Sequence, residues 1–120
     1  MLTVLRVTGE LAEVGAMVDA INTVSPQTMT PRARKDGYAA TVSDSDDWDD
    51  HVRAIEAFVE AHREHLTRAA RGGVSIHFDT AIEPDDVRAR AYTSFGCSPS
   101  LHRELGAIGA WLVLSWYTGD

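Results

Sequence analysis

Residues 44–79 have the sequence DSDDWDDHVRAIEAFVEAHREHLTRAARGGVSIHFD, in which a long amphipathic segment leads directly into an alternating one. Aspartate and serine residues before Trp48 can cap a helix and suit its positive end, and Gly72-Gly73 follow the last arginine as a stop signal. The spacing therefore predicts a helix over 46–71. Its apolar stripe comprises Trp48, Val52, Ile55, Phe58, Val59, His62 and Leu66.

Four other segments have the patterns of strands. Residues 74–79 alternate apolar and polar side chains, which is typical of a strand with one buried face. Residues 2–8 and 110–117 carry apolar side chains on both faces, so we expect two interior strands. Residues 38–43 alternate more weakly and predict a further strand.

Two shorter helices are predicted on either side of this central region. Residues 10–22 carry apolar side chains at helical spacing, with acidic residues in the first turn. Ser98-Pro99 is a typical helix start, with serine as the cap and proline at the first helical position. Residues 83–96 fit either a short helix or an extended edge, and both alternatives stay open.

The order of these elements predicts an α+β fold. We expect a two-layer sandwich, with helices on one face of a four- or five-stranded sheet, as a variant of the ferredoxin-like architecture. Helices rather than tight hairpins flank the clear strands, so some strands can pair in parallel. No repeat or low-complexity linker interrupts the 120 residues, which predicts a single domain over 1–120.

Charge and composition narrow the classes of function. Eighteen acidic and eleven basic residues give a net charge of −7, which argues against non-specific nucleic-acid binding. The same charge suits a basic partner, or serves solubility alone. A single cysteine, no apolar run of about 20 residues and no basic leader predict a cytoplasmic protein without a membrane segment.

Several short motifs carry a resemblance to a known family. They are Thr8-Gly9-Glu10, Ser25-Pro26, Lys35-Asp36-Gly37 and the run from Phe95 to Ala107, followed by an apolar strand that Tyr117 closes. The chain resembles, over about residues 2–117, the bacterial family catalogued as domain of unknown function 4279. The segment 81–94 departs from that pattern, because it is longer and more charged. The resemblance implies a compact bacterial α+β domain and a loose association with toxin–immunity proteins, and it supplies no catalytic residue.

The acidic run is the first candidate site. Its carboxylates do not fit a calcium loop, because the sixth position counted from Asp44 is Asp49 where such a loop needs glycine. Two interpretations remain, namely helix capping with a solvated acidic surface, or a docking patch for a basic protein such as a toxin. The candidate partner-binding residues are Asp44, Asp46, Asp47, Asp49 and Asp50.

A basic cluster formed by Arg32, Arg34 and Lys35 is the second candidate site. It could bind an anion or an RNA backbone, or it could be a solvated loop. Single-strand binders also need exposed aromatic residues, for which only Tyr38 and Tyr92 are candidates. We therefore predict no nucleic-acid partner.

Histidine and cysteine patterns predict neither a metal site nor catalysis. His62 and His65 could share an ion on a helix surface, but the chain has no HExxH motif and no paired cysteines. His62 lies on the apolar stripe, which favours a hydrogen-bonded core histidine. Nothing near Cys97 or His102 marks an activated thiol. The three tryptophans are predicted to lie in the core, and we expect no cofactor.

Three hypotheses of function follow from these patterns. The preferred one is a non-enzymatic interaction domain, with an immunity-type inhibitor of a basic toxin as its sharpest form. The second is a small-ligand module with a pocket between sheet and helices, which a solid core would exclude. The third is an enzyme, which requires titratable groups that converge in one cleft.

Overall fold

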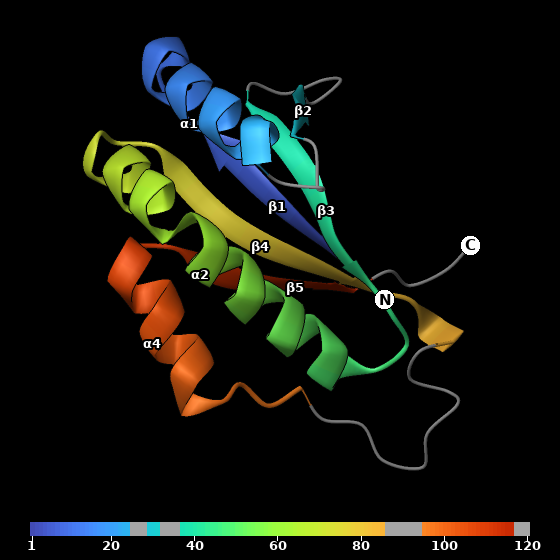
Figure 1. Ribbon diagram of the computed structural model, residues 1–120. Coiled ribbons are helices and arrows are strands. Elements are labelled where there is room, and N and C mark those ends of the chain that lie inside the picture. Colours follow the sequence, from blue (N-terminus) through green and yellow to red (C-terminus); the bar gives the residue numbers. More distant parts are fainter. Residues whose placement is uncertain (25–28, 32–36, 86–94, 117–120) are drawn as a thin grey trace.

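One mixed sheet with helices on one face forms the protein (Figure 1). The computed structural model describes residues 1–24, 29–31, 37–85 and 95–116. The α+β class, the five strands and the packing of the helices on one face confirm the prediction. In chain order the elements are β1 (Leu2–Thr8), α1 (Leu11–Val24), β2 (Thr30–Pro31), β3 (Tyr38–Asp44), α2 (Trp48–Arg71), β4 (Ser75–Ile82), α4 (Pro99–Ile108) and β5 (Trp111–Trp116).

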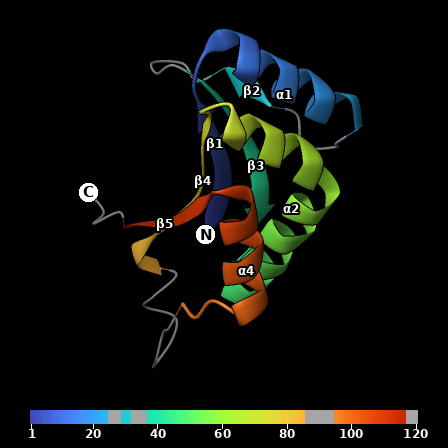
Figure 2. The ribbon, with the colours of Figure 1, turned by 90° about the vertical axis from the view of Figure 1, so that its left-hand side faces the viewer.

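The sheet has the strand order β2-β3-β1-β4-β5, with β1 at its centre. Strand β1 pairs antiparallel with both β3 and β4, so Leu5 lies opposite Ala40 on one side and Phe78 on the other. Strand β5 pairs in parallel with β4, with Leu112 opposite Phe78. Helices α1, α2 and α4 lie on the same side of the sheet (Figures 1 and 2).

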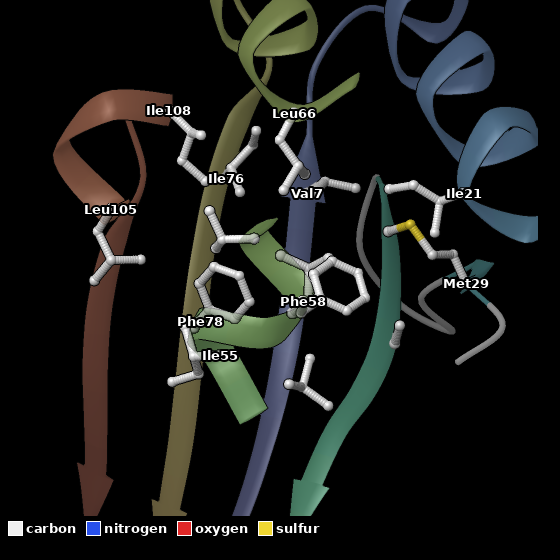
Figure 3. Close-up of a cluster of buried hydrophobic side chains, with 14 of the residues drawn as sticks. Val7, Ile21, Met29, Ile55, Phe58, Leu66, Ile76, Phe78, Leu105 and Ile108 are labelled. Carbon is white, nitrogen blue, oxygen red and sulfur yellow. The ribbon is translucent and has the colours of Figure 1, made fainter. Parts of the chain in front are cut away.

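The core fills the space between the sheet and the helices (Figure 3). Every second side chain of β1 and β4 points toward the helices, because successive residues of a strand face opposite ways. Phe78 of β4 meets Phe58 of α2 edge to face, with 6.2 Å between ring centroids. Leu5, Ile55 and Phe78 have no exposed surface, so the layers are held by close apolar packing.

Element boundaries lie near those predicted. Helix α2 begins at Trp48 rather than residue 46, because Asp47 is extended and caps the helix from outside. Helix α1 reaches Val24 and β4 reaches Ile82, both beyond the predicted ends. The open alternatives for 83–96 concern a segment of which residues 86–94 lie outside the described part. None of the described helices is long and apolar enough to cross a membrane.

Two predictions about the last strand were wrong. Strand β5 lies at an edge of the sheet rather than in its interior. Trp111 and Trp116 are 48% and 57% exposed, whereas Trp48 is buried as expected. Apolar residues on both faces of a strand indicate cover above and below, but they do not reveal whether a second strand lies alongside.

Candidate functional site

Residues 44–50, which we call the acidic segment, join the end of β3 to the first turn of α2. All five of its aspartates are exposed. Between them lie Ser45, which is half-buried, and Trp48, which is buried, and these two residues fix the path of the chain. The structure therefore brings together the five predicted partner-binding residues on one end of the helical layer.

Two of the five carboxylates help to build the helix start. The Asp47 side chain accepts a hydrogen bond from the backbone N–H of Asp49 at 3.1 Å, as an N-cap does. The Ser45 hydroxyl donates to Asp50 at 2.7 Å, and Asp50 also pairs with Arg53. The Ser45 hydrogen bond, followed by the bond to Arg53, lowers the pKa of Asp50 below its usual value. The capping interpretation is therefore confirmed for Asp47, and Asp50 has a structural role as well.

Asp44 and Asp49 differ from that pair. Their carboxylates are exposed and make no hydrogen bond or ion pair with other residues in the part of the chain that the structure describes. Among the described residues, these two carboxylates therefore lose no hydrogen bond or ion pair when they bind something outside the protein. They are the two members of the acidic segment best placed to meet a cationic group.

A buried tryptophan anchors the acidic segment on the helical side. Trp48 is 3% exposed, and its indole N–H donates to the carbonyl oxygen of Gly96 at 2.7 Å. Its ring meets Phe95 edge to face at 5.5 Å. The start of α2 is thereby held against the chain that leads into α4.

A buried polar chain anchors the same segment to the sheet. His51 is fully buried, and its Nε2 lies 2.9 Å from the carbonyl oxygen of Ser45. A carbonyl oxygen can only accept, so Nε2 carries a proton. Nδ1 is hydrogen-bonded to the Thr3 hydroxyl at 2.8 Å, and Thr3 is bonded to the Thr80 hydroxyl at 2.7 Å. The helix, the loop and two central strands are linked through this chain.

Sequence reasoning missed this polar chain. No local pattern assigns a role to His51. Thr80 lies past the predicted end of its strand, so its inward position was not visible. The available signal was period-two spacing, which places Thr3 with Leu5 and Thr80 with Phe78 on the core face.

The sheet face opposite α1, α2 and α4 carries a second polar cluster that was not predicted. Arg6 of β1 and Asp79 of β4 form an ion pair, with 3.6 Å between Nε and Oδ2. Ser115 of β5 donates to Asp79 at 2.6 Å. Beside them, the rings of His77 and Trp111 stack at 5.2 Å. These contacts join β1, β4 and β5 across this face.

The other predicted candidates do not form a site. Arg32, Arg34 and Lys35 lie outside the described residues. Among the residues that are described, no group of three histidine, cysteine, aspartate or glutamate side chains is placed to hold a metal ion. His62 is buried as expected, but its Nδ1 has no hydrogen-bond partner among them, contrary to the prediction of a hydrogen-bonded histidine.

Three hollows lie at the surface of the described part of the chain. One of about 320 Å³ lies at the end of the sheet beside Met1 and Asp44, and one of about 130 Å³ lies between α1 and α2. A third, of about 690 Å³, runs along the outer face of α2. The space between sheet and helices is filled by apolar side chains instead. The described core therefore shows no pocket between sheet and helices, which is where the small-ligand hypothesis expects one.

Comparisons with protein-family models, curated proteins and solved structures find no match to this chain. The resemblance to domain of unknown function 4279 therefore stays a prediction.

Proposed function

We propose that the protein is a non-enzymatic interaction domain that binds a basic protein through the acidic segment. The observation that carries this proposal is the exposure of all five aspartates within seven residues. Arg53 pairs with one of them, Asp50, and leaves Asp44 and Asp49 without a described partner. A surface of this kind attracts cations and speeds association with them.

The anchoring of the acidic segment supports the same proposal. Ordering a flexible loop on binding costs free energy, and a loop already held in place avoids much of that cost. Trp48 and His51 are both buried within the segment or one residue beyond it. Their hydrogen bonds hold the backbone that carries the carboxylates.

The chemistry of the single thiol supports a role without catalysis. Burial raises the pKa of Cys97, and a raised pKa disfavours the thiolate that a nucleophile requires. For the partner we propose a basic protein toxin, with this chain as its inhibitor. The net charge of −7 and the family resemblance support that finer proposal.

The experiment is affinity capture from lysate of the source organism, washed at low and at high salt, with identification of what remains bound. The double variant Asp44→Asn/Asp49→Asn removes two charges and leaves the capping contacts of Asp47 and Asp50 intact. The matched control, Asp19→Asn/Glu60→Gln, removes two exposed charges elsewhere on the surface.

We expect one stoichiometric basic partner that is lost at high salt, because exposed charge pairs are screened by ions. The double variant should bind it at least tenfold more weakly, and the control should bind as the wild type does. A clean lane at low salt, or equal loss in both variants, would contradict the proposal.

A further inference from the structure

In the part of the chain that the structure describes, β5 forms an edge of the sheet, and its own residues carry none of the usual protective features. Phe95 meets the Trp116 ring edge to face at 5.6 Å, at the end of the strand. Its six residues, Trp-Leu-Val-Leu-Ser-Trp, include no charged side chain and no proline. Both tryptophans are about half exposed, and Leu112, Val113 and Leu114 are only partly buried. Edge strands present unpaired backbone groups, and proteins usually blunt them with charges, prolines or bulges.

The opposite edge shows the contrast within the same sheet. Strand β2 has two residues, and the second is Pro31, which has no N–H to offer another strand. Strand β5 instead pairs with β4 in an unbroken register from Trp111 to Trp116, so no bulge interrupts this pair. In the part of the chain that is described, only the β5 edge combines length with apolar side chains.

We propose that β5 is the interface with a second copy of this chain, and that the two β5 strands pair antiparallel about a two-fold axis. In a two-fold dimer the same surface of each copy forms the interface, and the backbone groups of one β5 edge can hydrogen-bond to those of another. Such an axis continues the sheet from one copy to the next. Leu112 and Leu114, on the face that carries the helices, then meet the same apolar residues of the other copy.

Charge favours a second copy over a basic partner at this edge. Two copies that each carry −7 repel each other wherever their carboxylates face. Strand β5 contributes no carboxylate, and Asp79 on the neighbouring strand is already paired with Arg6 and bonded to Ser115. A basic protein would find no unpaired carboxylate on β5 to bind. An identical apolar edge meets no repulsion there.

The size of the edge sets the expected affinity. Six residues of strand span about 20 Å. One such strand and two tryptophan side chains bury less than the roughly 1,200 Å² at which stable interfaces begin. We therefore expect a reversible dimer with a Kd on the order of 10 μM.

This inference does not depend on the proposed function. Strands β1 and β4 separate β5 from β3, whose end begins the acidic segment. Phe95 lies between Trp48 and Trp116, with ring centroids at 5.5 Å and 5.6 Å, but the two surfaces share no residue. Each surface therefore has its own substitutions, and either can fail its test without the other.

The test is analytical ultracentrifugation of the full chain from about 1 to 300 μM, a range that brackets the expected Kd. The wild type should shift from monomer to dimer across this range. Val113→Lys places a charge at the centre of β5, where Asp79 lies opposite on β4, and should raise the Kd at least tenfold. The matched control is Val24→Lys, which adds the same charge at an exposed valine at the end of α1.

Hydrogen exchange of the wild type provides a readout that needs no variant. Backbone amides of residues 111–116 should exchange more slowly at 300 μM than at 1 μM, and those of α1 should not change. A monomer at 300 μM would overturn the proposal. A dimer whose β5 amides show no added protection from exchange would also overturn it. The same holds for a dimer that Val113→Lys and Val24→Lys weaken equally.

Discussion

At the scale of single residues, Thr3 has an unusual position for a polar side chain. It lies fully buried on the central strand, where its hydroxyl joins His51 to Thr80. Buried polar groups destabilise a protein unless they are hydrogen-bonded, so each member of this chain depends on the others. The acidic segment owes part of its fixed position to one hydroxyl in the sheet.

Replacing that hydroxyl tests the anchor. Thr3→Val keeps the shape of the side chain but leaves His51 Nδ1 and the Thr80 hydroxyl without their partner. We expect the free energy of unfolding to fall by about 1–3 kcal/mol, measured by urea denaturation. Thr41→Val is the control, because Thr41 is exposed on β3, and it should change stability by less than about 0.5 kcal/mol. Equal effects of the two variants would show that the buried chain contributes nothing.

His62 makes stability depend on pH. Burial, followed by the nearby charge of His65, lowers the pKa of His62 from its usual 6.5. The unfolded chain then binds the proton more readily than the folded protein does. The free energy of unfolding is therefore not reduced by His62 above about pH 6.5. It falls as the pH drops below that value, and it stops falling once the pH is below the lowered pKa of His62 in the folded protein.

We therefore expect His62→Gln to flatten the fall in unfolding free energy between about pH 7 and pH 5. Denaturant titrations at a series of pH values measure this slope. His102→Gln, at an exposed position on α4, should leave the wild-type slope unchanged. An unaltered slope in His62→Gln would contradict the assignment.

Residue roles were predictable where they depend on local sequence. Ser98 was identified as a cap from its place before an apolar run, and capping by the aspartate and serine residues before Trp48 was expected without naming Asp47, because capping involves neighbours only a few residues apart. The roles of Thr3 and His51 depend on partners 48 residues apart in the chain. No local pattern reveals such a pair.

At the scale of elements, Gly37 shows how closely two strands approach. It precedes β3 with a φ of +108°, a conformation that residues with a side chain rarely adopt. A Cβ built at this position would overlap the carbonyl oxygen of Val7 on β1. The start of the β1–β3 pair therefore requires glycine.

Two glycine substitutions should act in opposite directions. Gly37→Ala should lower the free energy of unfolding by about 1–3 kcal/mol, because the backbone must shift or strain. Gly15→Ala lies inside α1, where an added Cβ meets nothing within 4 Å, and should raise it by about 0.5–1 kcal/mol. Thermal and urea denaturation measure both. Stabilisation by Gly37→Ala would show that the turn tolerates a side chain.

The elements themselves were largely predictable, because periods of 2 and of about 3.6 residues identify strands and helices locally. The position of β5 was not. Its apolar faces reflect the helices on one side and the His77–Trp111 stack on the other, and neither shows whether another strand lies alongside. Strand order depends on long-range pairing, which sequence periodicity does not record.

At the scale of the whole molecule, the structure separates two surfaces with opposite character. The acidic segment lies at the junction of β3 and α2, and the apolar edge of β5 lies on the far side of β4. The first suits a basic partner, and the second suits an identical copy. A dimer through β5 would present two acidic segments, so the assembly could bind two partner molecules.

The acidic segment was predictable as a candidate because its charges are adjacent in the chain. Its five aspartates are exposed. Which of them contact other residues of the helix start, and which do not, could be learned only from the structure. Asp47 and Asp50 serve the start of α2, whereas Asp44 and Asp49 point to no described partner. This division determines which substitutions test binding without disturbing the fold.

The measurement that tests the central claim most directly is the salt dependence of affinity for the captured basic partner. Isothermal titration of the wild type and of Asp44→Asn/Asp49→Asn at several salt concentrations would provide it. We predict that affinity falls steeply with salt for the wild type and less steeply for the variant, which has lost two of the screened charges. Equal affinities and equal salt dependence for the two proteins would show that the partner binds elsewhere.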